Sequence, residues 1–267
     1  MSKPIRNRLM LGILITAVLF GLSGCLSQKT GSDEGDEYNG GLVWNNWTKS
    51  IAGGTDELPP GVINKDFLRC KACHGWDAKG ANGGYVRRSG FPEKDTRPKP
   101  TKGTDLSHLL GRIATADVEH VNGRSWTTEN NKMPNLTQTG GLTYKQIDDV
   151  TAFLNKGPKI GDIATIDISQ KPVKYTFKNA DPASGKDLYA KSCQLCHGAD
   201  GNQMEVKLID YFRNDGKYSE GFHKIIYGAD EQMTRAVAGN LNAKQAAGIL
   251  SWIQIQADDT TKKGFSQ

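Results

Sequence analysis

The sequence predicts an all-α protein with two small domains in tandem, joined by a short extended linker and preceded by a leader and a flexible tether. Three observations predict it: a basic and then apolar N-terminus, a C-x-x-C-H motif that occurs twice, and an amphipathic helical pattern that closes each half. A chain of 267 residues is long enough for two modest domains. The expected segments are the leader 1–24, the tether 25–41, domain 1 at 42–157, the linker 158–179 and domain 2 at 180–267.

The N-terminus has the pattern of a secretion signal. Basic residues precede the uncharged run Leu9–Leu22, which is shorter than the roughly twenty residues of a membrane-spanning helix. The ending Leu22-Ser23-Gly24-Cys25 resembles the lipobox of bacterial lipoproteins, in which the chain is cut before the cysteine and lipid is attached to it. We therefore expect Cys25 to be lipidated, with an ordinary soluble secretion signal as the alternative. In that family an aspartate after the cysteine retains the protein in the inner membrane, so Leu26 favours the outer membrane.

Residues 28–41 are rich in Gly, Ser, Asp and Glu, which predicts a flexible tether. The net charge of +5 is small and is spread over both halves, so it does not indicate a nucleic-acid binder. A basic stretch within 87–102 is either a solvated loop or a docking patch for an acidic redox partner. Its cations are Arg87, Arg88, Lys94, Arg97, Lys99 and Lys102.

The other four cysteines belong to two copies of one motif, Cys70-Lys71-Ala72-Cys73-His74 and Cys193-Gln194-Leu195-Cys196-His197. C-x-x-C-H is the attachment motif of haem c. The two sulfurs bond the vinyl groups of the porphyrin, and a spacing of one helical turn presents both on one side. The histidine that follows, His74 or His197, then lies under the iron as its proximal ligand. The sequence therefore predicts two covalently bound haems c, whose attachment outside the cytoplasm agrees with the leader.

Other uses of paired cysteines fit less well. A zinc site needs four ligands, and the remaining histidines are His108, His120 and His223. A thioredoxin-like pair or a structural disulfide explains one C-x-x-C, but not two copies that are each followed by histidine in an exported chain.

The two motifs anchor a repeat. A short helical segment is expected before each motif, at 66–69 and at 184–189, with Ser184 as the second N-cap. A closing helix is expected from a Thr143 cap to Gly157, and another after an Asn242 cap. Between the halves, apolar residues alternate with polar ones around Pro172, which predicts two short extended segments.

This order resembles the class I cytochrome c fold, in which the first and last helices cross and the haem lies in the crevice. The resemblance covers roughly 60–157 and 180–257. It implies that Met133 and Met233 are the distal iron ligands, each on the loop before the closing helix. Proline follows the distal methionine in the family pattern, and Pro134 follows Met133 here. Thr234 after Met233 departs from this pattern, as does a long insertion between Cys73 and Met133. His120 and His223, which occupy equivalent places in the repeat, are the rival distal ligands.

A haem held by histidine and methionine leaves no open position for a substrate, so we expect one-electron transfer without bond-making catalysis. The implied partners are redox proteins, with the lipid anchor at a membrane of the bacterial cell envelope, on its periplasmic or cell-surface side. A dihaem peroxidase with a labile distal ligand is one alternative. A dihaem thiosulfate dehydrogenase is a weaker alternative. Enzymes of that class use a cysteine as the distal ligand of the active haem, and every cysteine of this chain is already assigned to lipid or haem attachment. The electron-accepting cytochrome subunit of a dehydrogenase or reductase complex is a further alternative.

Overall fold

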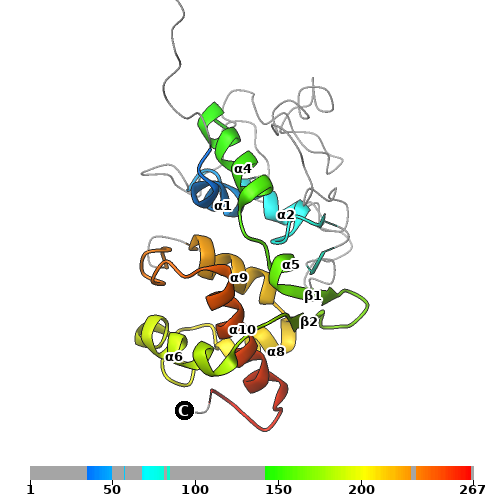
Figure 1. Cartoon of the computed structure of the whole chain (residues 1–267), viewed down its shortest axis with the longest axis vertical. Helices are drawn as coiled ribbons and strands as arrows, with labels where there is room; N and C mark the ends of the chain where they lie inside the picture. The colour runs from blue at the N-terminus through cyan, green and yellow to red at the C-terminus, as the bar shows by residue number, and fades with distance from the viewer. Residues whose placement is uncertain are drawn as a thin grey trace, which may run out of the picture. The chain divides into compact units, whose positions relative to one another are not determined.

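The computed structural model is mainly helical, with one small β-hairpin (Figure 1). It describes residues 35–49, 57, 68–80, 83–84, 142–229 and 233–265. The leader, Cys25, His108, His120, Met133 and the basic stretch lie outside these residues. Within the part that is described, no helix is long and apolar enough to cross a membrane. The elements are α1 (Glu37–Asn45), α2 (Cys70–His74), α4 (Tyr144–Lys156), α5 (Ile160–Ile163), β1 (Ala164–Asp167), β2 (Lys174–Phe177), α6 (Pro182–Ser192), α7 (Gln194–His197), α8 (Leu208–Asp215), α9 (Tyr218–Tyr227) and α10 (Ala243–Asp258).

Domain 1 is built on helices α1 and α4, which pack against each other (Figure 1). The Asp36 side chain accepts hydrogen bonds from two backbone amides of the first turn and so begins α1. Val43 and Trp44 at the other end of this helix are fully buried. The predicted tether therefore ends too late, because Glu37–Gly41 are helical. Two adjacent glycines and several polar residues hid the helix in the composition of this stretch.

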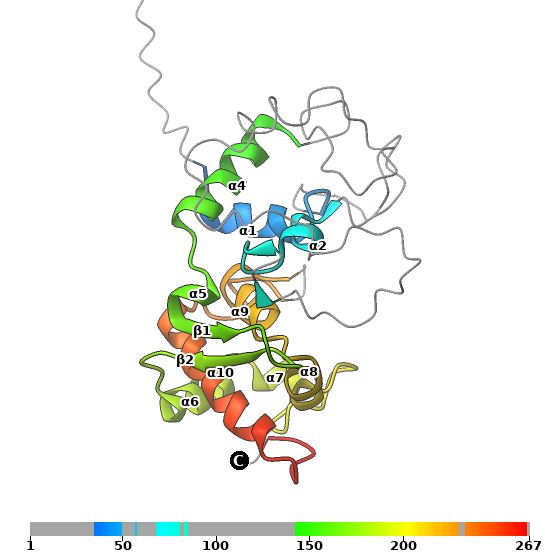
Figure 2. The same ribbon diagram turned by 90° about the vertical axis from the view of Figure 1, so that its right-hand side faces the viewer.

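Domain 2 is built on α6 and α10 in the same way (Figure 2). Asp181 caps α6, with Pro182 in the first turn, so the helix begins before the predicted cap Ser184. Asn242 caps α10 and Thr143 caps α4, each with a complete capping box. Both predicted closing helices are confirmed.

A glycine lets each pair of helices approach closely. A Cβ added at Gly40 of α1 would lie 1.9 Å from the carbonyl oxygen of Asp149 in α4, and one at Gly185 of α6 would lie 2.0 Å from that of Gly248 in α10. The counterpart of α6 in domain 1 is therefore α1. Of the segment 66–69, which the sequence predicts for that role, only Leu68 and Arg69 lie within the described residues. Leu68 at its end is fully buried, and its carbonyl oxygen accepts a hydrogen bond from the Trp47 amide.

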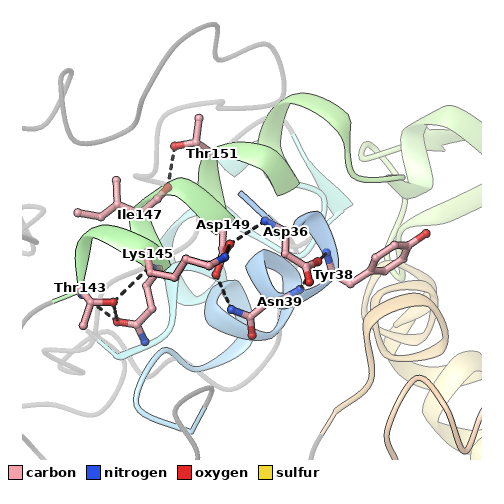
Figure 3. A network of polar contacts seen from close by, with 9 residues as sticks. Asp36, Tyr38, Asn39, Thr143, Lys145, Ile147, Asp149 and Thr151 are labelled. Atoms are coloured by element: carbon pink, nitrogen blue, oxygen red, sulfur yellow. Dashed lines mark hydrogen bonds and ion pairs between the residues drawn. The ribbon is translucent and has the colours of Figure 1, made fainter. Parts of the chain in front are cut away.

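A buried carboxylate joins α4 to the start of α1. Asp149 is fully buried and accepts a 2.7 Å hydrogen bond from the Asp36 amide and another from the side chain of Asn39 (Figure 3). Lys145, one turn earlier in α4, supplies the positive charge. A buried carboxylate with several partners holds its position tightly, because leaving any of these groups unpaired would cost free energy.

The linker contains the two predicted extended segments. β1 and β2 form an antiparallel hairpin in which Ile166 pairs with Tyr175 (Figure 2). The sequence did not predict the short helix α5 that precedes it. The Tyr175 hydroxyl shares a 2.8 Å hydrogen bond with Ser219 of α9, and Gln254 of α10 donates to the Tyr175 carbonyl. The hairpin is therefore packed on domain 2.

We expect Gly40→Ala to lower the free energy of unfolding by about 2 kcal/mol or more, since the new methyl group meets backbone of α4 that cannot yield cheaply. Gly161→Ala in α5 is the matched control, because its Cβ would meet nothing nearer than the Lys79 side chain at 3.5 Å. Urea unfolding of both variants measures the difference. Equal stabilities would contradict the close approach of α1 and α4.

Candidate haem-binding sites

In domain 1 the attachment motif forms the short helix α2, which ends at His74. Gly75 follows with φ of 75° and ψ of 170°, a conformation that favours glycine. The Gly75 carbonyl accepts a 2.9 Å hydrogen bond from the indole Nε1 of Trp44, which is fully buried in α1. His74 is almost fully buried, and its ring centroid lies 6.0 Å from that of Trp44. The helix that sequence reasoning missed thus positions the first motif.

The second motif is held by the same device. Gly198 follows His197 with φ of 79° and ψ of 162°, close to the values at Gly75. Its carbonyl accepts a 2.8 Å hydrogen bond from the hydroxyl of Tyr189, which is buried in α6. Tyr189 stands four residues after the crossing glycine of its helix, as Trp44 does in α1. The sequence signal that could have found α1 is therefore a glycine followed four residues later by a large aromatic residue.

The residues of the second motif fit a haem. Nδ1 of His197 is buried and has no hydrogen-bond partner in the described part of the chain. Burial, and then the positive charge of Lys224, lower the pKa of this histidine, which favours the neutral ring that binds metals. Cys193 is half-buried and Cys196 is exposed on the same turn. Two thiols beside an imidazole with an unsatisfied ring nitrogen are the groups that haem c requires.

The environment of Cys193 differs from that of a reactive thiol. Burial raises its pKa to about 12, with the neighbouring Cys196 as a second cause. The attacking cysteine of a thioredoxin-like pair instead has a lowered pKa, so that it is a thiolate at neutral pH. The raised pKa of Cys193 therefore does not match that of an attacking cysteine in thiol–disulfide exchange.

The predicted distal ligand Met233 lies on the loop between α9 and α10, as expected, and is half-buried. The Ala229 amide donates a 2.8 Å hydrogen bond to the Met233 carbonyl, and Gly228 forms an isolated bridge with Thr234. These contacts close the loop at its base. Met133, its predicted counterpart in domain 1, lies outside the described residues.

His223, the rival ligand in domain 2, lies where the two halves of the chain meet. It lies in α9 with 1% of its surface exposed, and its Nε2 is 2.9 Å from the Gly41 carbonyl oxygen of α1. Because a carbonyl oxygen can only accept, Nε2 carries the proton of the neutral ring. This arrangement gives His223 a place between the two domains. His120, its rival counterpart, is outside the described part of the chain.

Aromatic rings surround His223 at this junction. The rings of Trp76, Phe153 and Tyr227 have centroids 4.9, 5.6 and 4.7 Å from that of His223. Trp76 follows the first attachment motif, Phe153 belongs to α4 and Tyr227 ends α9. Sequence reasoning did not find this cluster, since nothing in the local pattern tells which helix from the other half will cover a buried face.

Two family matches agree with this arrangement. The cytochrome c family matches residues 65–158, which include α2 and α4 but begin after α1. The family described as cytochrome C oxidase, cbb3-type, subunit III matches residues 180–253, from the start of domain 2 into α10. Searches of curated proteins and of solved structures gave no match. The chain thus contains two cytochrome c domains in tandem, each with one covalently bound haem c.

Proposed function

We propose that this protein transfers single electrons between redox partners through two haems, each bound by a motif histidine and a loop methionine. The observation that carries the proposal is the equivalent presentation of His74 and His197 by a buried aromatic side chain and a glycine. A bound haem with both axial positions filled exchanges one electron through its exposed edge. The chain would hold each haem by its attachment motif and supply the axial ligands.

We propose Met133 and Met233 as the distal ligands. The half-buried side chain of Met233 and the closed base of its loop support this choice in domain 2. The Gly41 contact of His223 uses its Nε2, so the rival could reach an iron only through Nδ1. With both irons six-coordinate there would be no position for a substrate, so the protein would be a carrier.

The visible and near-infrared spectrum of the oxidised holoprotein tests the ligation. We expect a methionine-to-iron charge-transfer band with the strength of two haems, and Met233→Leu should remove the share of one of them. Met204→Leu is the matched control, since Met204 is exposed on the loop after the second motif and should leave the band unchanged.

High-spin features in the unaltered protein, together with peroxide turnover, would instead favour the peroxidase alternative. Mass spectrometry should find two covalently attached haems, one lost with each pair of motif cysteines replaced by serine. If neither haem were found attached to the chain, the proposal of electron transfer would be overturned.

We further propose that lipid on Cys25 anchors the protein at the cell envelope, with the outer membrane favoured. The support is the basic and apolar leader and the lipobox-like ending before Cys25. Labelled fatty acid should be incorporated into the unaltered chain and not into Cys25→Ser. Fractionation of the two membranes would identify the compartment, and release of the unaltered protein into the soluble fraction would contradict anchoring.

A second candidate is a cytochrome subunit of a larger redox complex. The family that matches domain 2 is described as an oxidase subunit, and the match to residues 180–253 favours this reading. A free carrier should purify alone after mild solubilisation. Co-purification of a dehydrogenase, reductase or oxidase in fixed ratio would favour the subunit.

A further inference from the structure

The side chain of Asn45, the last residue of α1, bridges the two domains. Its Nδ2 donates a 2.9 Å hydrogen bond to the Ala229 carbonyl of domain 2. Its Oδ1 accepts a hydrogen bond from the Lys71 ammonium, within the first attachment motif. A carbonyl can only accept and an ammonium can only donate, so both partners require the same orientation of the amide.

The Ala229 end of this bridge belongs to the loop of Met233. The Ala229 peptide carbonyl binds Asn45, while its amide donates to the Met233 carbonyl over 2.8 Å. Gly228, with φ of 90°, turns the chain out of α9 immediately before this point. Two hydrogen bonds therefore connect the side chain of Asn45 in domain 1 to the backbone of Met233 in domain 2.

A second contact ties the same loop to the same helix. The guanidinium carbon of Arg235, two residues after Met233, lies 3.8 Å from the ring centroid of Tyr38 in α1, a cation–π distance. Arg235 is kept in place by a 2.8 Å hydrogen bond from its NH1 to Asn240. Helix α1 thus holds the loop on both sides of Met233.

We propose that Asn45 is a positioning residue for the distal ligand of the second haem, and that domain 1 thereby sets the ligation of domain 2. The proposal rests on the proposed role of Met233 as that ligand. Asn45 would limit the movement of the loop away from the iron, and its contact with Lys71 would link that restraint to the first attachment motif.

Two substitutions test the two hydrogen bonds of the Asn45 side chain separately. Asn45→Asp keeps the size of the side chain and the partner for Lys71, but it replaces the donor to Ala229 by an acceptor. Lys71→Met removes the other contact and leaves the donor. Asn155→Asp, on the exposed side of α4, adds the same charge to domain 1 and is the control.

The readouts are the near-infrared band and imidazole binding to the oxidised holoprotein, because a loosened methionine is displaced more easily. In Asn45→Asp the near-infrared band should weaken. The loss should not exceed the contribution of one haem, which is what Met233→Leu removes. Imidazole should bind one haem about fivefold more tightly, as expected for loss of one hydrogen bond. Lys71→Met should shift both readouts less, and Asn155→Asp should shift neither.

Equal band strength and equal imidazole affinity in Asn45→Asp and Asn155→Asp would overturn the positioning role. If Met233→Leu itself left the band unchanged, the proposed ligand would fail instead, so the two failures are distinguishable. Should Asn45→Asp not accumulate as folded holoprotein, Arg235→Gln tests the second contact of the loop. It should loosen the second haem in the same direction, and an unchanged affinity would again count against the proposal.

Discussion

Acidification is expected to destabilise the folded protein by about 1.4 kcal/mol for each pH unit through His223 alone. Burial is the main cause that lowers the pKa of His223 from 6.5 to about 3. Between these two values the unfolded chain binds a proton that the folded protein does not. The contribution of His223 to stability is therefore complete above about pH 6.5 and declines as the pH falls toward about 3.

The surroundings of His223 explain why it stays neutral. Its hydrogen bond with Gly41 and the charge of Glu220 raise its pKa, while Lys71 and Lys224 lower it. These influences are smaller than that of burial among the rings of Trp76, Phe153 and Tyr227. Protonation would place an uncompensated charge between the domains, so acid should separate α9 from α1 first.

His223→Gln isolates this effect. Glutamine can donate to Gly41 from a similar position but does not titrate, so the difference in pH slope between the two proteins belongs to His223. Urea unfolding of the holoproteins at several pH values between about 4.5 and 7.5 measures it. Parallel slopes would show that His223 is protonated in the folded state or that its site opens before the domains unfold.

The repeat could be predicted from the sequence because its parts are local. The two C-x-x-C-H motifs, the Thr143 and Asn242 caps and the periodicity of α4 and α10 all depend on residues within a few positions of each other. The extended segments of the linker were found for the same reason. Each of these patterns predicts the same local structure regardless of how distant parts of the chain are arranged.

Helix α1 could not be found in the same way. Its glycines lower the helical propensity of the segment, and the helix is stabilised by distant residues, chiefly Asp149 and Phe153 of α4. The place of His223 depends on the same helix, because its hydrogen-bond partner is Gly41. Once residues 37–41 of α1 are interpreted as part of a tether, the contacts that this helix makes with domain 2 cannot be inferred from the sequence.

Phe153→Ala is expected to have the largest effect on the junction between the domains. Phe153 is almost fully buried, and its ring contacts those of Trp44, His223 and Tyr227, with centroids 5.3, 5.6 and 5.1 Å away. Removing a buried phenylalanine costs about 3–5 kcal/mol through lost burial and the cavity that remains. Tyr144→Ala is the control in the same helix, because Tyr144 is 71% exposed and its loss should cost about 0.5 kcal/mol or less.

The loss should also change how the protein unfolds. Phe153 contacts α1 and α9 at once, so its removal weakens domain 1 and its contact with domain 2 together. The core of domain 2 around Tyr189, Trp252 and Phe265 shares none of these contacts. Calorimetry of the holoprotein should therefore show one transition in the unaltered chain and two in Phe153→Ala, with domain 2 melting later. A single transition at a lower temperature would mean that the domains depend on each other through contacts other than this aromatic cluster.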